Sequence, residues 1–205
     1  MTMDIDSGVQ RVISQAIAAA EAKTSGEIFC VVTRASDDYR FVALTWAALV
    51  ALSLPLPLVA FTSLPAVQIF AAQLCLFLLT GLASLWDPLR LALVPRSLKH
   101  RRAHRNALEQ FLAHGLHTTK SRTGVLLFVS LAERHAEVIA DEAIYKKVTA
   151  NVWDETVAAL IAGAGRGDIA AGFSDAIAHA GAVLAQHFPP QTGDSNELPD
   201  HLVVL

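Results

Sequence analysis

Acidic side chains between residues 133 and 142 are the groups in this sequence most suited to chemistry. Asp141 and Glu142 follow an apolar run typical of a β-strand, and α/β domains often bind ligands where strands end. Carboxylate oxygens are the usual ligands of hard divalent cations, so this pair could hold such an ion together with Glu133 or Glu137. The alternative is structural, with Asp141 capping a helical turn and Glu142 in its first turn. Two adjacent carboxylates favour the structural alternative over a metal site.

Histidine, glycine and cysteine residues give weaker candidates. His100 and His104 are four residues apart on a predicted helix and could face one metal ion, but the arginines around them favour a solvated surface. The glycine-rich segment 163–168 follows a helix and lacks the Lys-Ser/Thr of a phosphate-binding loop. It is therefore predicted to be a helix–helix turn that ends with Asp168 as a cap. Cys30 lies inside a predicted strand, where packing is the expected role, and no catalytic triad is predicted.

The elements that must position these residues surround an unusually apolar block. Apolar residues make up 53% of the 205 residues and charged residues 17%, against roughly 25% charged in a typical soluble domain. Residues 41–86 contain no Asp, Glu, Lys or Arg. The block divides into segments 41–60 and 64–86, each long enough to cross a hydrocarbon core about 30 Å thick as a helix. We therefore predict a two-helix transmembrane hairpin, with its first helix bent near Pro55.

Basic residues directly after this block set the predicted topology. The connection between the two apolar segments carries no charge, whereas a basic cluster follows the second one. The positive-inside rule then places both termini and the soluble domain in the cytoplasm, at the bacterial inner membrane. The first residues have neither the basic region nor the apolar run of a signal peptide, in agreement with this topology. Because an anionic lipid surface attracts nearby cations, the basic cluster is also predicted to contact lipid headgroups. The basic cluster consists of Arg96, Lys99, Arg101, Arg102 and Arg105.

The remainder is predicted to be one discontinuous soluble domain, formed by residues 1–40 and 87–189. Apolar runs predict two buried strands and one edge strand, and apolar residues three and four apart predict four helices. Together they indicate an α/β fold, a small α/β/α sandwich with a short mixed sheet. The polar residues 190–205 are predicted to form a flexible tail. The strands are expected at residues 27–33, 125–129 and 136–140, and the helices from Ser7, over 95–116, over 152–162 and over 168–187.

Several of these stretches resemble the TPM domain family. They are SGEIFCVVT at residues 25–33, TGVLLFVS at residues 123–130 with its continuation to Asp141, Trp153, and the closing helix 167–189. The resemblance implies an α/β/α sandwich, in a bacterial subgroup carried by short membrane proteins. It also implies two kinds of activity, because some relatives are described as acid phosphatases and others as assembly or repair factors for membrane complexes. The matching residues belong to strands and turns, and no catalytic motif is among them.

These features predict two alternative functions. The first is a non-enzymatic binding or assembly module at the cytoplasmic face of the inner membrane, with the lipid bilayer, its anionic headgroups and another membrane protein as partners. The alternative is a weak metal-assisted acid phosphatase that uses Asp141, Glu142 and Glu133, with a divalent cation as its cofactor. No other cofactor is predicted. The net charge of −3 argues against a nucleic-acid partner.

Overall fold

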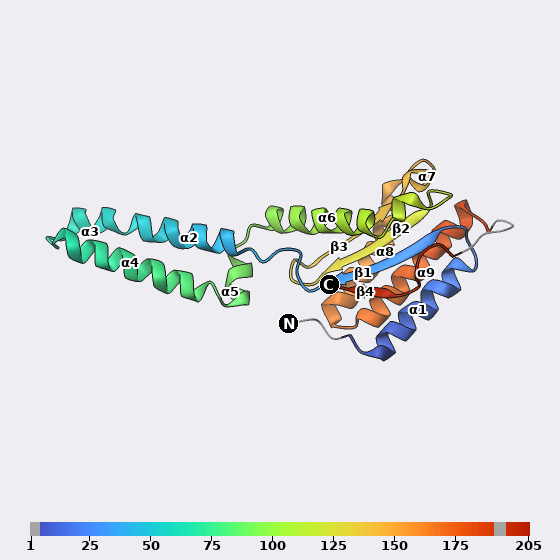
Figure 1. Cartoon of the computed structure of the whole chain (residues 1–205), viewed down its shortest axis with the longest axis horizontal. Helices are drawn as coiled ribbons and strands as arrows, with labels where there is room; N and C mark the ends of the chain where they lie inside the picture. Colours follow the sequence, from blue (N-terminus) through green and yellow to red (C-terminus); the bar gives the residue numbers. More distant parts are fainter. Residues whose placement is uncertain (1–4, 191–195) are drawn as a thin grey trace. The chain divides into compact units, whose positions relative to one another are not determined.

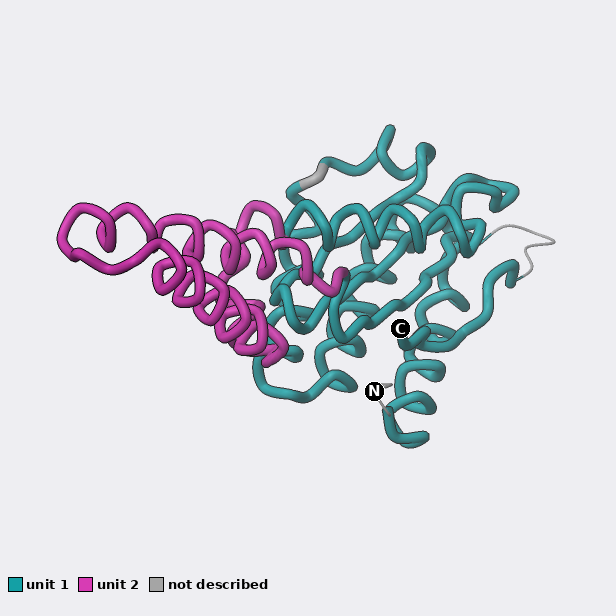
Figure 2. The backbone as a smooth tube through the Cα atoms, turned by 60° about the vertical axis from the view of Figure 1, so that its left-hand side comes forward, with its two compact units in different colours: residues 1–36, 100–205 teal, residues 37–99 magenta. Residues whose placement is uncertain are grey.

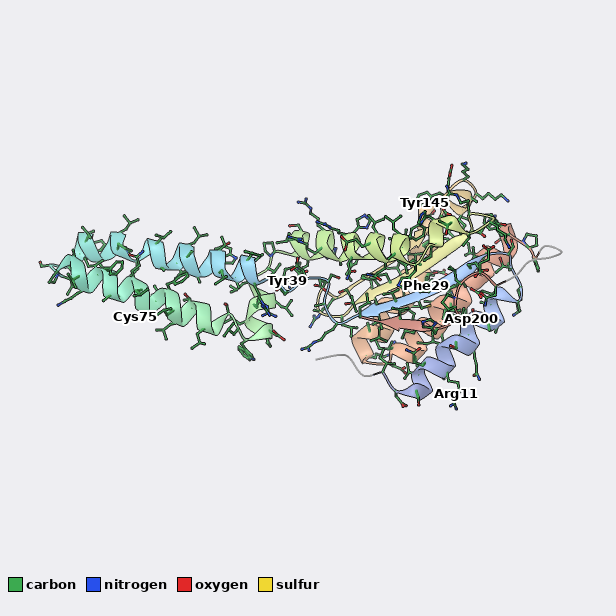
Figure 3. The ribbon with its side chains drawn as sticks, viewed as in Figure 1. Arg11, Phe29, Tyr39, Cys75, Tyr145 and Asp200 are labelled. Carbon is green, nitrogen blue, oxygen red and sulfur yellow. The ribbon has the colours of Figure 1, made fainter. Side chains whose placement is uncertain are left out.

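The computed structural model describes residues 5–190 and 196–205, which form two compact units. Unit 1 consists of residues 1–36 and 100–205, and unit 2 consists of residues 37–99 (Figure 2). Unit 1 therefore contains segments from both sides of the apolar block. Of the two cysteines, Cys30 is buried in unit 1 and Cys75 is exposed in unit 2 (Figure 3), and both are free thiols.

A four-stranded mixed sheet forms the centre of unit 1, in the order β3-β2-β1-β4. The strands are β1 (Glu27–Thr33), β2 (Gly124–Ser130), β3 (His135–Ala140) and β4 (Leu202–Val204). β1 is parallel to both β2 and β4, while β2 is antiparallel to β3. Every residue of β1 and β2 is buried, as expected for strands that are apolar on both faces. The three predicted strands and the edge position of the third are thus confirmed.

Helices cover both faces of this sheet (Figure 1). On one face, a core that includes Ile17, Leu160 and Phe173 joins three helices to the sheet. On the other face, α6 packs its Ala107 and Phe111 against the sheet. The mixed α/β fold therefore follows the sequence pattern. The helices of unit 1 and the shared helix α6 are α1 (Ser7–Glu21), α6 (Arg96–Ala113), α7 (Glu142–Tyr145), α8 (Asp154–Arg166) and α9 (Ile169–His187), with short 3-10 helices at Leu116–Thr118 and Ala150–Trp153.

The buried face of α6 differs from the apolar stripe that the sequence predicts. The apolar residues after position 107 predict a stripe of Leu108, Phe111, Leu112 and Leu116. Phe111 and Leu116 are buried, but Leu108 and Leu112 are 40% and 57% exposed. The buried residues are Ala103, Ala107 and Phe111, spaced four apart. Alanine at this spacing lets the helix approach the sheet closely, so the larger leucines are left on the outward face. The predicted stripe is thus confirmed at Phe111 and Leu116 and wrong at Leu108 and Leu112.

The C-terminal residues complete the sheet, so the predicted flexible tail over residues 190–205 is wrong for β4. Leu202 is buried, and its backbone exchanges two hydrogen bonds with the Gln10 side-chain amide, at 2.9 and 3.2 Å. The Glu27 carboxylate accepts hydrogen bonds from the N–H groups of Glu197 and Leu198, both at 3.2 Å. The polar composition therefore belongs to a connection that leads into a strand. Residues 191–195 of the predicted tail lie outside the described residues.

Unit 2 consists of helices that are apolar nearly all round. α2 packs against α4, and the buried residues of α2 are three alanines at four-residue spacing, whereas α4 buries none. Two helical segments are long and apolar enough to cross a membrane, Arg40–Phe61 and Ala66–Ala83, with mean hydropathies of 2.1 and 1.9. The helices are α2 (Arg40–Ser53), α3 (Pro55–Phe61), α4 (Ala66–Ala83) and α5 (Asp87–Ala92).

Proline residues set the boundaries of these apolar helices. α2 ends at Ser53 and α3 begins at Pro55, at the position where the first apolar helix is predicted to bend. α4 is shorter than the predicted segment 64–86, because Pro65 is extended and precedes the first helical residue. Its 18 residues still correspond to about 27 Å of helix.

Candidate functional site

Asp141 and Glu142 lie at the carboxyl end of β3, where they begin α7. The Asp141 Oδ1 atom accepts a hydrogen bond from the Glu142 N–H group at 2.7 Å, which makes Asp141 the helix cap. Its Oδ2 atom lies 4.0 Å from the Arg122 guanidinium. Glu142 is exposed and forms an ion pair with Lys146 at 2.7 Å. The hydrogen bond from Lys146 and the positive charge of Lys146 lower the pKa of Glu142. The contacts of both carboxylates are those of the structural alternative.

Glu133 lies at the opposite end of β3, in the turn that follows β2. This buried carboxylate accepts hydrogen bonds from the Ser130 hydroxyl and from the Ser36 N–H group, the latter at 3.1 Å. The two serine hydroxyls are themselves 3.0 Å apart. Because a strand of six residues spans about 20 Å, Glu133 and Asp141 do not meet. The structure therefore does not bring the three predicted catalytic carboxylates together.

Glu137, in the middle of β3, instead meets histidines. Its Oε2 atom lies 2.8 Å from Nδ1 of His104 on α6 and 3.6 Å from Nε2 of His135. The rings of His100 and His135 are 5.1 Å apart between centroids. Burial alone would raise the pKa of Glu137, but the hydrogen bonds and charges of His135 and His104 outweigh it and lower this pKa. We call these four residues the histidine cluster.

The histidine cluster joins two elements that are far apart in the sequence. His135 and Glu137 share a face of β3 because side chains alternate along a strand, and His100 and His104 share a face of α6. The spacing of His100 and His104 is visible in the sequence, but the part played by His135 is not, since nothing in the sequence indicates that α6 packs beside β3. Across residues 5–190 and 196–205, no three His, Cys, Asp or Glu side chains are arranged to hold a metal ion.

The basic cluster predicted at the lipid surface lies in the first half of α6. Arg101, Arg102 and Arg105 are exposed, and Arg105 forms an ion pair with Glu109 at 2.9 Å. At about 100° per residue, Arg101 and Arg105 share one side of the helix with the exposed leucines at positions 108 and 112. The outward face of α6 thus combines positive charge with apolar side chains.

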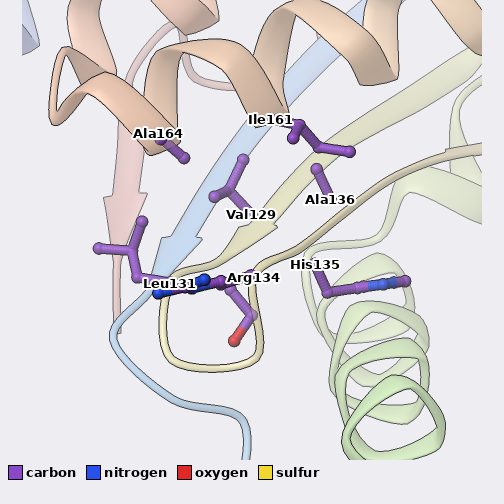
Figure 4. Close-up of a pocket in the computed structure, with 9 residues that line it drawn as sticks. Val129, Leu131, Arg134, His135, Ala136, Ile161 and Ala164 are labelled. Carbon is purple, nitrogen blue, oxygen red and sulfur yellow. The ribbon is translucent and has the colours of Figure 1, made fainter. Parts of the chain in front are cut away.

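A cavity of about 470 Å³ opens at the carboxyl end of β2 (Figure 4). The hairpin between β2 and β3 forms one wall, and Ile161, Ala164 and Gly165 of α8 form the other. Most of the lining is apolar, and Arg134 is its one permanent charge within the described residues. The His135 ring points away from the α8 wall, toward α6 (Figure 4). The cavity is suited to a small ligand that is mainly apolar.

A second cavity, of about 320 Å³, contains carboxylates that no sequence motif marks. Glu21, Glu27 and Asp200 line it. Glu21 accepts a hydrogen bond from the Ile28 N–H group at 2.7 Å. Burial, together with the charges of Glu27 and Asp200 and a hydrogen bond with Asp200, raises the pKa of Glu21 to about 8. Glu21 and Asp200 thus connect α1 to the segment that precedes β4.

A mixed sheet with helices on both faces and a ligand-sized cavity at its strand ends defines a small α/β domain. Residues 89–183 match the family model of the TPM domain, the family that the sequence was found to resemble. The BA42 protein of the psychrophilic bacterium Bizionia argentinensis, solved by NMR, has the same fold with a TM-score of 0.61 and 20% sequence identity. That match covers 98% of this chain and 95% of the BA42 chain. No curated protein matches the sequence.

Proposed function

We propose that this protein is a membrane-anchored TPM domain that acts as a binding or assembly module at the cytoplasmic face of the bacterial inner membrane. The observation that carries the proposal is the exposure of unit 2. α4 has no buried residue, and large side chains such as Val67 and Phe70 are 78% and 66% exposed. A core helix of a soluble protein would be mostly buried, whereas a hydrocarbon environment accommodates such a surface.

The proposed orientation rests on the basic cluster of α6. The cluster follows the second apolar helix within a short stretch of chain, while the residues between the helices, from 62 to 65, carry no charge. The positive-inside rule then favours the cytoplasm for unit 1. The phosphatase alternative would need Asp141, Glu142 and Glu133 around one phosphate, and β3 separates Glu133 from the other two. We therefore favour a binding role, with another membrane protein as the partner.

Membrane fractionation of the full chain tests the anchoring. We expect the protein to stay in membranes through a carbonate wash, and a C-terminal epitope to be digested by protease only in inside-out vesicles. Leu74→Arg, in the middle of α4, should release part of the protein, because arginine at the centre of a span costs about 2.5 to 3.5 kcal/mol. Leu108→Arg, at an exposed position of α6, is the matched control. Two results would overturn the proposal. They are full release of the unmodified protein by carbonate, and digestion of the C-terminal epitope in right-side-out vesicles.

Fluorescence quenching in lipid nanodiscs tests the contact of the basic cluster with headgroups. A fluorophore on Ser97→Cys, in a Cys75→Ser background, should be quenched by spin-labelled headgroups more strongly in anionic discs than in neutral ones. Arg101, Arg102 and Arg105 contribute about 1 kcal/mol each when close to an anionic surface, so replacing all three by Gln should remove the difference. Added salt should also reduce it. Equal quenching in both kinds of disc would contradict a headgroup contact.

A further inference from the structure

We propose that the cavity between the β2–β3 hairpin and α8 binds a small organic monocarboxylate. In this proposal, Arg134 forms an ion pair with the carboxylate, and the α8 wall packs against a short apolar chain of the ligand. The inference deepens the binding role proposed above by naming a ligand class, and it rests on that role but not on membrane attachment.

The backbone of Arg134 is the first feature that supports a ligand here. Its φ is +51°, and its N–H group donates to the Leu131 carbonyl at 3.2 Å to close the hairpin turn. Hairpin loops of this kind usually carry glycine at the left-handed position, because glycine adopts this conformation without steric cost. An arginine in the left-handed conformation destabilises the turn. Its presence therefore indicates that the arginine side chain has a function.

The charge of Arg134 is the second feature. Arg134 lines the cavity, and no carboxylate in the described part of the chain pairs with its guanidinium. The neighbouring Glu133 is engaged by Ser130 and Ser36. One planar guanidinium matches one carboxylate through two parallel hydrogen bonds. The charge of the site therefore fits a single carboxylate.

The α8 residues that line the cavity determine the chemistry of the part of the ligand beyond its carboxylate. Ile161 is 50% exposed beside the cavity, a large apolar side chain that lacks a full set of neighbours. The volume lies within the usual range of small-molecule sites, and the carboxyl ends of strands are where α/β sheets bind ligands. Two late α8 carbonyls, which would repel an anion, already accept the N–H groups of Gly167 and Asp168, at 3.2 and 3.0 Å. The wall thus favours a short hydrocarbon chain next to the carboxylate.

Arg122 offers a matched control within the same unit. Its φ is +55°, so it has the same unusual backbone conformation as Arg134. Its guanidinium, however, lies 4.0 Å from Asp141 and 3.9 Å from Glu142, and it also donates to the His117 carbonyl. A substitution of Arg122 removes the same charge without touching the cavity.

NMR of the full chain in neutral lipid nanodiscs, with labelled isoleucine methyl groups, tests the proposal. Butyrate and N-acetylvaline, the latter mimicking an apolar peptide C-terminus, serve as carboxylate probes, and the tighter of the two identifies the source of the ligand. Two further probes are controls. Inorganic phosphate has the negative charge without a hydrocarbon chain, and butanol has the hydrocarbon chain without the charge. We expect a carboxylate to shift the Ile161 methyl signal, with at least tenfold weaker binding in Arg134→Gln and unchanged binding in Arg122→Gln.

Three results would overturn the proposal. They are no Ile161 shift with either carboxylate at tens of millimolar, an equal shift with phosphate or butanol, and equal losses in the two arginine variants. Arg134→Gly keeps the hairpin conformation, so it shows whether a loss in Arg134→Gln comes from the side chain or from misfolding. The membrane fractionation above fails or succeeds independently of these results.

Discussion

Glu21 and Glu137 are partly buried carboxylates of unit 1 whose surroundings shift their pKa values in opposite directions. Glu21 faces two other acidic side chains, Glu27 and Asp200, and its pKa rises to about 8. Glu137 faces His104 and His135, and its pKa falls below the usual value. Because a pKa difference between the folded and unfolded states makes stability depend on pH, the two residues predict opposite pH dependences.

Glu21→Gln should remove a loss of stability at high pH. With a raised pKa, Glu21 contributes stability that is fully present below its ordinary pKa of 4.5 and is lost as pH rises toward about 8. The variant keeps the acceptor for the Ile28 N–H group and cannot ionise. At about pH 9 we expect it to be more stable than the unmodified protein by roughly 2 to 4 kcal/mol, measured by denaturant unfolding in detergent. Glu155→Gln, at an exposed position, is the control, and parallel pH curves for all three proteins would refute the prediction.

Glu137→Gln should destabilise unit 1 with the opposite pH profile. The lowered pKa of Glu137 means that its contribution is present above its ordinary pKa and is lost as pH falls through the lowered value. The effect of the substitution should therefore be full at neutral pH and should shrink as the pH falls below the ordinary value of 4.5. We expect a loss of about 1 to 2 kcal/mol at neutral pH, measured by thermal or denaturant unfolding, and a smaller loss at acidic pH. A loss that does not change with pH, or an equal one in the exposed control Glu109→Gln, would show that the histidines are not responsible.

At the scale of elements, the crossing of α8 and α9 depends on two glycines. A Cβ atom on Gly163 would lie 2.3 Å from the Cα atom of Gly172, far inside a normal contact. Gly163→Ala should therefore push the helices apart and lower the free energy of unfolding by about 2 to 3 kcal/mol. Gly165→Ala, two residues along the same helix, meets nothing within 4 Å and should be neutral or stabilise by about 0.5 to 1 kcal/mol. Denaturant unfolding of the two variants makes the comparison, and similar effects would contradict a close crossing.

The edge strand β4 predicts a contrast between two leucines near its ends. Leu202 is 1% exposed and aligned with Cys30 of β1, whereas Leu205 is 46% exposed. Leu202→Ala should cost about 2 to 3 kcal/mol, since it empties a core position, and Leu205→Ala should cost less than about 1 kcal/mol. Thermal unfolding distinguishes the two. Equal effects would mean that this segment behaves as the flexible tail expected from its composition.

Local pattern predicted the long elements, and long-range packing decided the features that local pattern missed. The strands at 27–33 and 125–129 are uninterrupted apolar runs, so they were predicted almost to the residue. β4 was missed because three residues are too few for a pattern, and its pairing with β1 depends on chain far away. The histidine cluster was missed for the same reason, because it exists only where α6 lies beside β3. The left-handed backbone of Arg134 follows from a hairpin geometry that the sequence alone does not specify.

At the scale of the whole molecule, the region that matches the TPM family model is not a complete folding unit. Residues 89–183 include β2 and β3 but lack α1, β1 and β4. β1 pairs with β2 along seven residues, so its removal leaves a long apolar edge exposed. We expect the isolated segment to be aggregated or unfolded, measured by its soluble fraction and its amide NMR dispersion beside the full chain. A cooperative unfolding transition of the segment would contradict this expectation.

The central position of β1 also has a consequence for biosynthesis. β1 is made first, but all of unit 2 and the whole of α6 lie between Thr33 and Gly124, where its partner β2 begins. At about 5 to 20 residues per second, roughly 5 to 20 s separate the two strands on the ribosome. During that interval β1, apolar on both faces, has no partner strand, and β4 emerges later still. The nascent chain therefore needs a chaperone or a membrane surface to shield this one strand until the next is made.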